Sequence, residues 1–237
     1  MPINMMTEKI YRINYCDWAK ELYAKPIFIN KNIQKIYVDK WIQILKEQDE
    51  LSCKDFFDPQ IRGMMLKEKV EAPEIFQLPV YYNSNSLYIH FRVSRIIQII
   101  ENSKISADDL SEIDINEFTD KRRNINWTQT KDGVDIKTQP ILMAPLTIGK
   151  YYQWIVIDGN HRITDAIAKG RKKIKSIDLD PNWLVQNNLF CNGFDKYLYV
   201  FQNEMVALGT YIHKEGCSDE KAFALSYIFS KSVQCYV

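Results

Sequence analysis

The sequence predicts an α+β fold, a mixed sheet with flanking helices, together with an N-terminal extension and a C-terminal helical cover. Two patterns predict it: short strand-like runs in the middle of the chain, and apolar residues at helical spacing towards both ends. The 237 residues, 46% of them hydrophobic, suffice for one large domain or for a core domain with a substantial subdomain. We therefore expect a mixed extension over residues 1–103, a core over 104–180, and a helical segment over 181–237 packed on the core.

The N-terminal segments predict one long helix and a hairpin. From Lys31 to Gln48 apolar residues recur at helical spacing, which indicates an amphipathic helix. Val80–Tyr82 and Leu87–Phe91 have the composition of strands, and the turn-rich Asn83–Ser86 joins them. Ser94 is placed to cap a short helix after the second strand.

The predicted core begins with a hairpin signal and contains the most strand-like segment of the chain. Asp132–Gly133 predicts a tight turn, because both residues tolerate positive φ. Gln139–Met143 then predicts a strand, and Pro145–Lys150 a connection. In the next segment, Tyr151–Ile157, the continuous apolar run predicts a strand that is buried on both faces.

A helix and a further strand complete the predicted core. The turn at Asp158–Asn160 leads into a helix whose end is marked by Gly170. Ile174–Leu179 alternates between apolar and polar residues, as a half-buried strand does. After Pro181 the apolar spacing is helical again, and Ser218 is a suitable cap for a last helix.

The charge balance does not favour a protein that binds DNA mainly through its phosphates. Lys and Arg number 31, Asp and Glu number 30, and the formal net charge is +1, whereas such proteins usually carry a basic excess or a basic tail. Two tight basic runs, at Lys121–Arg123 and Lys169–Lys173, are interpreted as solvated loops or helix ends. A local nucleic-acid patch formed by the two runs stays open as the alternative.

The cysteines and the apolar runs indicate a cytoplasmic protein without a membrane partner. The five cysteines are odd in number and include no C-x-x-C pair, which argues against a disulfide framework and a zinc site. Met1–Lys9 has no apolar run of the signal-peptide type, and no stretch approaches the roughly 20 apolar residues that span a bilayer. His90 and His213 stand alone in the sequence, so we interpret each as a structural histidine rather than a metal ligand.

The turn from Asp158 to Arg162 has the residue types of a phosphate site. The first amides of a helix have no partner within it and the helix dipole is positive there, so an anion is stabilised. Gly159 lets the backbone approach a ligand closely, and Asn160 can cap the helix. Arg162 can donate two hydrogen bonds to phosphate oxygens, and His161 can add a donor or transfer a proton. Asp158 can orient a hydroxyl or help to hold Mg²⁺.

A plainer interpretation of the turn stays open, namely a capped helix whose Asp, Asn and His are ordinary turn residues. The context favours the phosphate site. A strand precedes the turn and a helix follows it, and a terminating Gly, a basic run and a further strand come next.

Three segments resemble the core of the ParB/sulfiredoxin superfamily. They are Gln139–Leu142, Trp154–Lys169 with its D-G-N-H-R turn, and Ile174–Leu179. In that superfamily a Q-P-[IL] strand and an [ED]-G-x-[HR]-R turn frame a nucleotide. The resemblance therefore implies a ParB/sulfiredoxin-like sheet for the core, and a nucleoside triphosphate or diphosphate with Mg²⁺ as its ligand.

The resemblance also implies which residues act at the site. Those that it implies for nucleotide binding are Gln139, Pro140, Gly159, Asn160, His161 and Arg162. Asp158 and His161 take the catalytic roles, and Asp158 is the implied ligand of Mg²⁺.

The turn separates this chain from two branches of the superfamily. Sulfiredoxins have a nucleophilic Cys where this chain has Asn160, and an amide cannot attack a phosphoryl-activated sulfur. ParB partition proteins bind CTP over a G-E-R-R turn beside a helix-turn-helix, and no such motif follows Asp180. The turn is similar to D-G-H-H-R of free-serine kinases and D-G-Q-H-R of phosphorothioation-associated proteins. Those kinases use an upstream catalytic Glu, a role that we assign to none of the upstream glutamates here.

Two functional hypotheses follow. In the first, the chain is a nucleotide-binding enzyme, a phosphotransferase or NTPase that uses ATP, ADP or CTP. In the second, it is a non-catalytic DNA-binding or regulatory module of a mobile element or defence system, and the same turn holds a DNA phosphate or a regulatory nucleotide.

Overall fold

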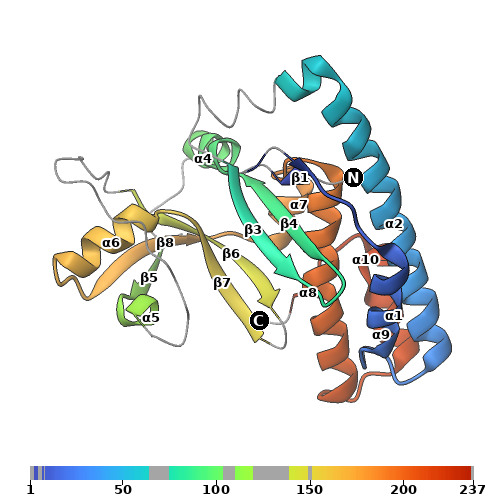
Figure 1. The fold of residues 1–237 in the computed structure, drawn as a ribbon. Helices are drawn as coiled ribbons and strands as arrows, with labels where there is room; N and C mark the ends of the chain where they lie inside the picture. Colours follow the sequence, from blue (N-terminus) through green and yellow to red (C-terminus); the bar gives the residue numbers. More distant parts are fainter. Residues whose placement is uncertain are drawn as a thin grey trace. The chain divides into compact units, whose positions relative to one another are not determined.

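The computed structural model is an α+β protein that divides into two compact units, and most of its elements are labelled in Figure 1. It describes residues 3–4, 7, 9–63, 75–103, 110–119, 139–148 and 151–235. Unit 1 comprises Met1–Ile96, Leu146–Gln153 and Pro181–Val237, and unit 2 comprises Ile97–Pro145 and Trp154–Asp180. The predicted α+β class is confirmed. The predicted hairpin at Asp132–Gly133 lies outside the described residues.

Unit 1 consists of helices and two small sheets. Its helices are α1 (Tyr15–Ala24), α2 (Lys31–Phe57), α7 (Pro181–Gln186), α8 (Gly193–His213), α9 (Asp219–Leu225) and α10 (Tyr227–Ser230). Its sheets are the antiparallel pairs β1 (Ile3–Asn4) with β2 (Lys9–Ile10) and β3 (Ile75–Tyr81) with β4 (Ser86–Arg92). Both ends of the chain therefore contribute to this unit. That the segment 181–237 covers the predicted core stays a prediction.

Helix α2 is the predicted amphipathic helix, and it is longer than predicted. Asn30 caps it by accepting hydrogen bonds from the amides of Asn32 and Ile33, which confirms the predicted start. The helix continues past Gln48 to Phe57, because residues at helical spacing still face the interior there. The buried residues of its second half are Leu45, Asp49, Ser52 and Phe56.

The predicted hairpin of unit 1 is confirmed. β3 and β4 pair from Ile75 opposite Arg92 to Tyr81 opposite Ser86. Helix α4 (Val93–Asn102) follows β4 directly and begins one residue before Ser94, so the prediction that Ser94 caps this helix is wrong. Val93 and Ile96 are both buried, which fixes the first turn at the end of the strand.

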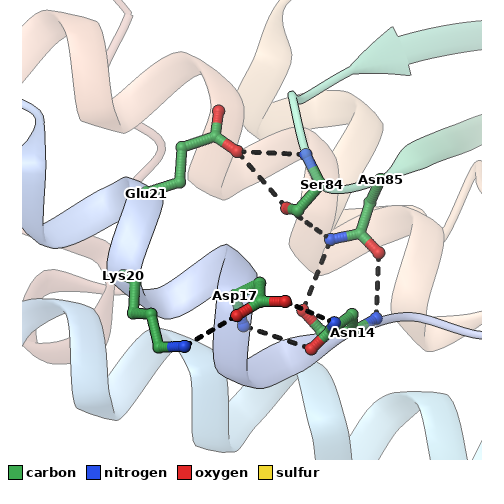
Figure 2. Close-up of polar contacts among 6 residues, drawn as sticks. All are labelled: Asn14, Asp17, Lys20, Glu21, Ser84 and Asn85. Carbon is green, nitrogen blue, oxygen red and sulfur yellow. Dashed lines mark hydrogen bonds and ion pairs between the residues drawn. The ribbon is translucent and has the colours of Figure 1, made fainter.

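Polar side chains attach α1 to the turn between β3 and β4, as Figure 2 shows. Asn14 caps α1 by accepting from the amide of Asp17 at 3.1 Å, and its own amide donates to Asn85 Oδ1 at 2.9 Å. Further along α1, the carboxylate of Glu21 accepts from the amide and the hydroxyl of Ser84, each at 3.3 Å. The polar residues that predict a turn thus also hold it in place.

Helix α8 carries polar side chains into the interior of unit 1. Its buried polar residues are Asp195, Gln202, Asn203 and Glu204. Two of them hold the main chain of Thr147: Gln202 Nε2 donates to its carbonyl, and Asn203 Oδ1 accepts from its amide, each at 2.8 Å. After α8, Ser218 caps α9 as predicted by accepting from the amide of Lys221.

Unit 2 contains a mixed sheet of four strands in the order β5-β8-β6-β7. Its strands and helices are β5 (Ser111–Asp114), α5 (Asn116–Thr119), α6 (Asn160–Ala168) and β8 (Lys173–Asp178), together with the larger parts of β6 (Ile141–Ile148) and β7 (Tyr151–Asp158). β8 pairs antiparallel with β5 and parallel with β6. Ile163 and Ala166 of α6 pack into a core with Ile141 and Met143 of β6, which fixes the helix on the sheet.

The strand that is buried along its length is β6, and not β7 as predicted. β6 lies between two neighbours in the sheet and is buried from Ile141 to Thr147, whereas β7 lies at the edge. β7 buries Ile157 but leaves Trp154–Val156 partly exposed. The predicted connection at Pro145–Lys150 is also wrong in its first part, because β6 continues to Ile148.

No helix in the described part of the chain is both long enough and apolar enough to cross a bilayer. The predicted cytoplasmic location stays a prediction.

Gln34 on α2 offers a test of how unit 1 is held together. Its Oε1 accepts from the amide of Phe28, and its Nε2 donates to the carbonyls of Leu22 and Lys25, each at 2.9 Å. Because the side chain is buried, Gln34→Ala removes three hydrogen bonds, and we expect the free energy of unfolding to fall by about 3 kcal/mol.

Urea unfolding of Gln34→Ala measures this loss, and Gln43→Ala is the matched control. Gln43 is exposed on the same helix, and among the described residues its side chain bonds only to Glu47, so Gln43→Ala should lower the free energy of unfolding by less than about 0.5 kcal/mol. Equal losses in the two variants would contradict the role of Gln34.

Candidate functional site

The predicted site residues come together at one corner of unit 2. This corner is formed by the end of β7, the first turn of α6 and the residues that enter β6. Contacts of Arg162 with Asp158, Gln139 and Pro140 join the three segments.

Gly159 makes the sharp change of direction between β7 and α6. Its φ of 109° lies in the left-handed region, where a side chain is strained. A Cβ at this position would lie 2.5 Å from Cγ2 of Ile141 and 3.1 Å from Nε of Arg162. The backbone can pass this close to β6 only because residue 159 has no side chain.

Helix α6 begins without a side-chain cap. Gly159 occupies the cap position, so Asn160 is already the first helical residue and does not cap the helix as predicted. The amides of Asn160, His161 and Arg162 have no acceptor among the described residues; the first bonded amide is that of Ile163, which donates to the carbonyl of Gly159 at 3.0 Å. Three donors at the positive end of the helix dipole are therefore available to an anion.

His161 projects from this first turn into solvent. Its side chain is exposed and forms no hydrogen bond or ion pair with the described residues. The side chain of Asn160 is half-buried and likewise makes no hydrogen bond among them. Both can therefore donate to a ligand without losing a contact that holds the fold.

Arg162 was predicted to donate two hydrogen bonds to a phosphate, but its guanidinium already has partners within the protein. Nη2 donates to Asp158 Oδ2 at 2.6 Å, and Nη1 donates to the carbonyls of Gln139 at 3.0 Å and Pro140 at 2.8 Å. The side chain of Arg162 is 13% exposed and that of Asp158 is 24% exposed. These bonds use three of the five N–H groups of a guanidinium, so a phosphate contact would rest on the other two.

Asp158 has one carboxylate oxygen that is not used within the described part of unit 2. Oδ2 accepts from Arg162, whereas Oδ1 makes no hydrogen bond there. No group of three or more His, Cys, Asp or Glu side chains that could hold a metal ion occurs among the described residues. A Mg²⁺ ion here would therefore take Asp158 together with ligand phosphates and water, which is the usual set for this ion.

The basic run after α6 lies at the opposite end of that helix from the turn. Nine residues at 1.5 Å each separate the two ends by about 13 Å. Two of its lysines are paired, Lys169 with Asp165 at 2.8 Å and Lys173 with Glu112 at 2.9 Å. The other predicted run, Lys121–Arg123, lies outside the described residues.

Unit 1 contains a buried polar cluster that sequence patterns did not predict, formed by His90, Asp195 and Gln77. The ring of His90, 1% exposed, has Asp195 Oδ2 at 3.0 Å from Nδ1 and Gln77 Oε1 at 2.9 Å from Nε2. Burial raises the pKa of Asp195, and the imidazole beside it opposes this shift. As expected, His90 is a satisfied structural histidine, and His213 bonds to the carbonyl of Pro26 at 2.8 Å.

Comparison with known proteins identified no similar protein. No protein-family model, no curated protein and no solved structure matches this chain. The assignment of the corner therefore depends on its own geometry.

Gly159→Ala tests the close approach on which this corner depends. The variant combines a strained φ with a contact of 2.5 Å to a fully buried side chain, so we expect a loss of at least about 2 kcal/mol in the free energy of unfolding. Gly170→Ala is the control, since φ there is also positive at 62° but no atom lies within 4 Å.

Chemical denaturation of both variants gives the comparison. The control should lose only about 1 kcal/mol, the cost of the left-handed backbone alone. A loss at residue 159 no larger than that at residue 170 would show that the turn can move away from β6.

Proposed function

We propose that unit 2 is a ParB/sulfiredoxin-type phosphate-binding core that holds the phosphates of a nucleotide at the start of α6. The observation that carries the proposal is the set of three amides directly after Gly159, at the positive end of a nine-residue helix, that have no acceptor in the described part of the chain. Phosphate is the ligand that fits such a set, because it offers several acceptors and negative charge at one point.

The side chains around the amides support the same ligand. His161 and Asn160 add donors from the exposed side of the turn. Arg162 holds Gln139 and Pro140 against the turn and supplies its remaining N–H groups. Oδ1 of Asp158 is available to Mg²⁺ on the phosphates.

Phosphoryl transfer is the reaction class that we propose for this site, as a phosphotransferase or NTPase. That reaction depends mainly on placement and on stabilisation of charge, which fixed amides and cationic side chains provide. A DNA-binding module is less well supported. The described basic run lies at the opposite end of α6, and two of its lysines are paired with Asp165 and Glu112, so it adds no positive charge at the turn itself.

Nucleotide binding is tested first by thermal shift. ATP, ADP and CTP, each with Mg²⁺, should be compared with Mg²⁺ alone and with tripolyphosphate. A ligand at about ten times its Kd stabilises by about 1.4 kcal/mol, which corresponds to roughly 3–5 °C in Tm for a chain of this size. An unchanged Tm with every nucleotide at millimolar concentration would overturn the proposal. A shift with tripolyphosphate alone would reduce it to a phosphate site.

His161→Ala is the sharpest variant at the site, because it removes a donor that makes no contact within the described fold. We expect nucleotide affinity to fall about 10- to 150-fold, the effect of losing one hydrogen bond to a charged group. Titration calorimetry measures the affinity, and denaturation should show unchanged stability. His213→Ala in unit 1 is the control and should bind as the unaltered chain does. Unchanged affinity in His161→Ala would remove this residue from the site.

A further inference from the structure

Helix α2 leaves a row of apolar side chains exposed on unit 1. Its buried side packs on α1, α8 and α9. Beside that buried side, Ile36 is 47% exposed and Leu51 is 50% exposed. The half-buried Ile33 and Ile44 lie on the same face of the helix, as their spacing requires. We call these four residues the α2 stripe. Single exposed apolar residues are normal on a protein surface, whereas a row along one helix face indicates a partner.

The aromatic ring of Phe229 on α10 extends this surface. The residue is 52% exposed, and its ring centroid lies 5.8 Å from Nζ of Lys40, which is on the same face of α2 as the stripe. The ring also packs edge-on against that of Phe223, with 5.0 Å between the centroids. These contacts hold the ring in place before a partner binds, so binding loses little side-chain freedom.

Two opposite charges lie on the face of the α2 stripe. Lys40 and Glu47 are both exposed, and neither forms an ion pair with a described residue. Seven residues, about 10.5 Å along the axis, separate them, so they cannot pair within one helix. The described hydrogen bond of Glu47 is the one that it accepts from Gln43 Nε2 at 2.9 Å. Both charges can therefore pair with a second molecule.

The order of these residues matches an antiparallel pairing of α2 with itself. Lys40 and Glu47 are placed symmetrically about a point between residues 43 and 44, and so are Ile36 and Leu51. A two-fold axis through that point brings Lys40 of one copy opposite Glu47 of the other, and Ile36 opposite Leu51. A parallel pairing in register would instead set like charges side by side. The charges therefore select the antiparallel arrangement.

We propose that the α2 stripe binds a second copy of this chain, so that two α2 helices pack antiparallel about a two-fold axis. The interface contains two ion pairs between Lys40 and Glu47 and two apolar contacts between Ile36 and Leu51, each of which joins the two copies. One helix and one aromatic ring from each copy form a small interface, which places the dimer in the weak class. The proposal concerns unit 1 and is independent of the phosphate site proposed for unit 2.

Sedimentation equilibrium of the full chain measures the dimer. Over roughly 1 to 500 µM chain, we expect monomer at the lowest concentration and a dimer fraction that rises with concentration. A chain that stays monomeric over this whole range would overturn the proposal.

Reversal of the two charges identifies the surface. Lys40→Glu or Glu47→Lys converts both ion pairs into contacts between like charges, so each variant should weaken dimerisation about 10- to 100-fold. The double variant restores opposite charges across the axis, and its dimer Kd should return to within about three-fold of that of the unaltered chain. Because the two residues are two turns apart in one helix, such a restoration requires contact between copies.

Lys46→Glu is the matched control for these reversals. Lys46 is an exposed lysine of α2 that lies outside the stripe, so its reversal should leave the dimer Kd unchanged. All three positions are exposed, and circular dichroism should show folded chains throughout. A dimer that is insensitive to both single reversals, is weakened equally by Lys46→Glu, or is not restored in the double variant would contradict the proposed surface.

Discussion

The corner of unit 2 depends on one constraint, the close approach of a side-chain-free residue to β6. Gly159 can adopt its left-handed conformation beside Ile141 only without a Cβ, and that conformation starts α6 with no side-chain cap. A Ser or Asp at the cap position would satisfy the amides itself. The glycine therefore has two effects. It lets strand, turn and helix pack tightly, and it leaves the first amides of the helix without an acceptor among the residues that the structure describes.

At this corner the ion pair of Asp158 and Arg162 attracts an anion less than the helix amides and His161 do. Asp158 and Arg162 form a close ion pair, so together they contribute little net field to an approaching phosphate. Attraction to an anion then depends on the fixed amides, the helix dipole and the exposed His161. Such a site binds mainly through short-range hydrogen bonds, whereas the cationic surfaces of DNA-binding proteins act at long range and lose affinity steeply with salt.

Local sequence predicted most elements but not the order of the strands. The turn at Asp158–Arg162, the helix after it and the hairpin before Arg92 follow from glycine, capping residues and apolar spacing, all of which act between near neighbours. Which apolar strand lies inside the sheet depends on pairing between distant segments, so β7 was mistaken for the buried strand in place of β6. The partners of Arg162 were also not predicted. Two of them are the main-chain carbonyls of Gln139 and Pro140, and residue type does not indicate which carbonyls a distant side chain will contact.

The interior of unit 1 also contains contacts that sequence patterns could not predict. Apolar spacing identifies α8 as a core helix, and yet that helix buries Asp195, Gln202, Asn203 and Glu204. Together these side chains contact three parts of the unit: Asp195 contacts His90 on β4, the two amides bond to Thr147, and Glu204 contacts α2 and α10. An apolar helix could pack in several registers, but a buried polar group is stable only where its partner lies. The polar residues of α8 thus specify which segments meet.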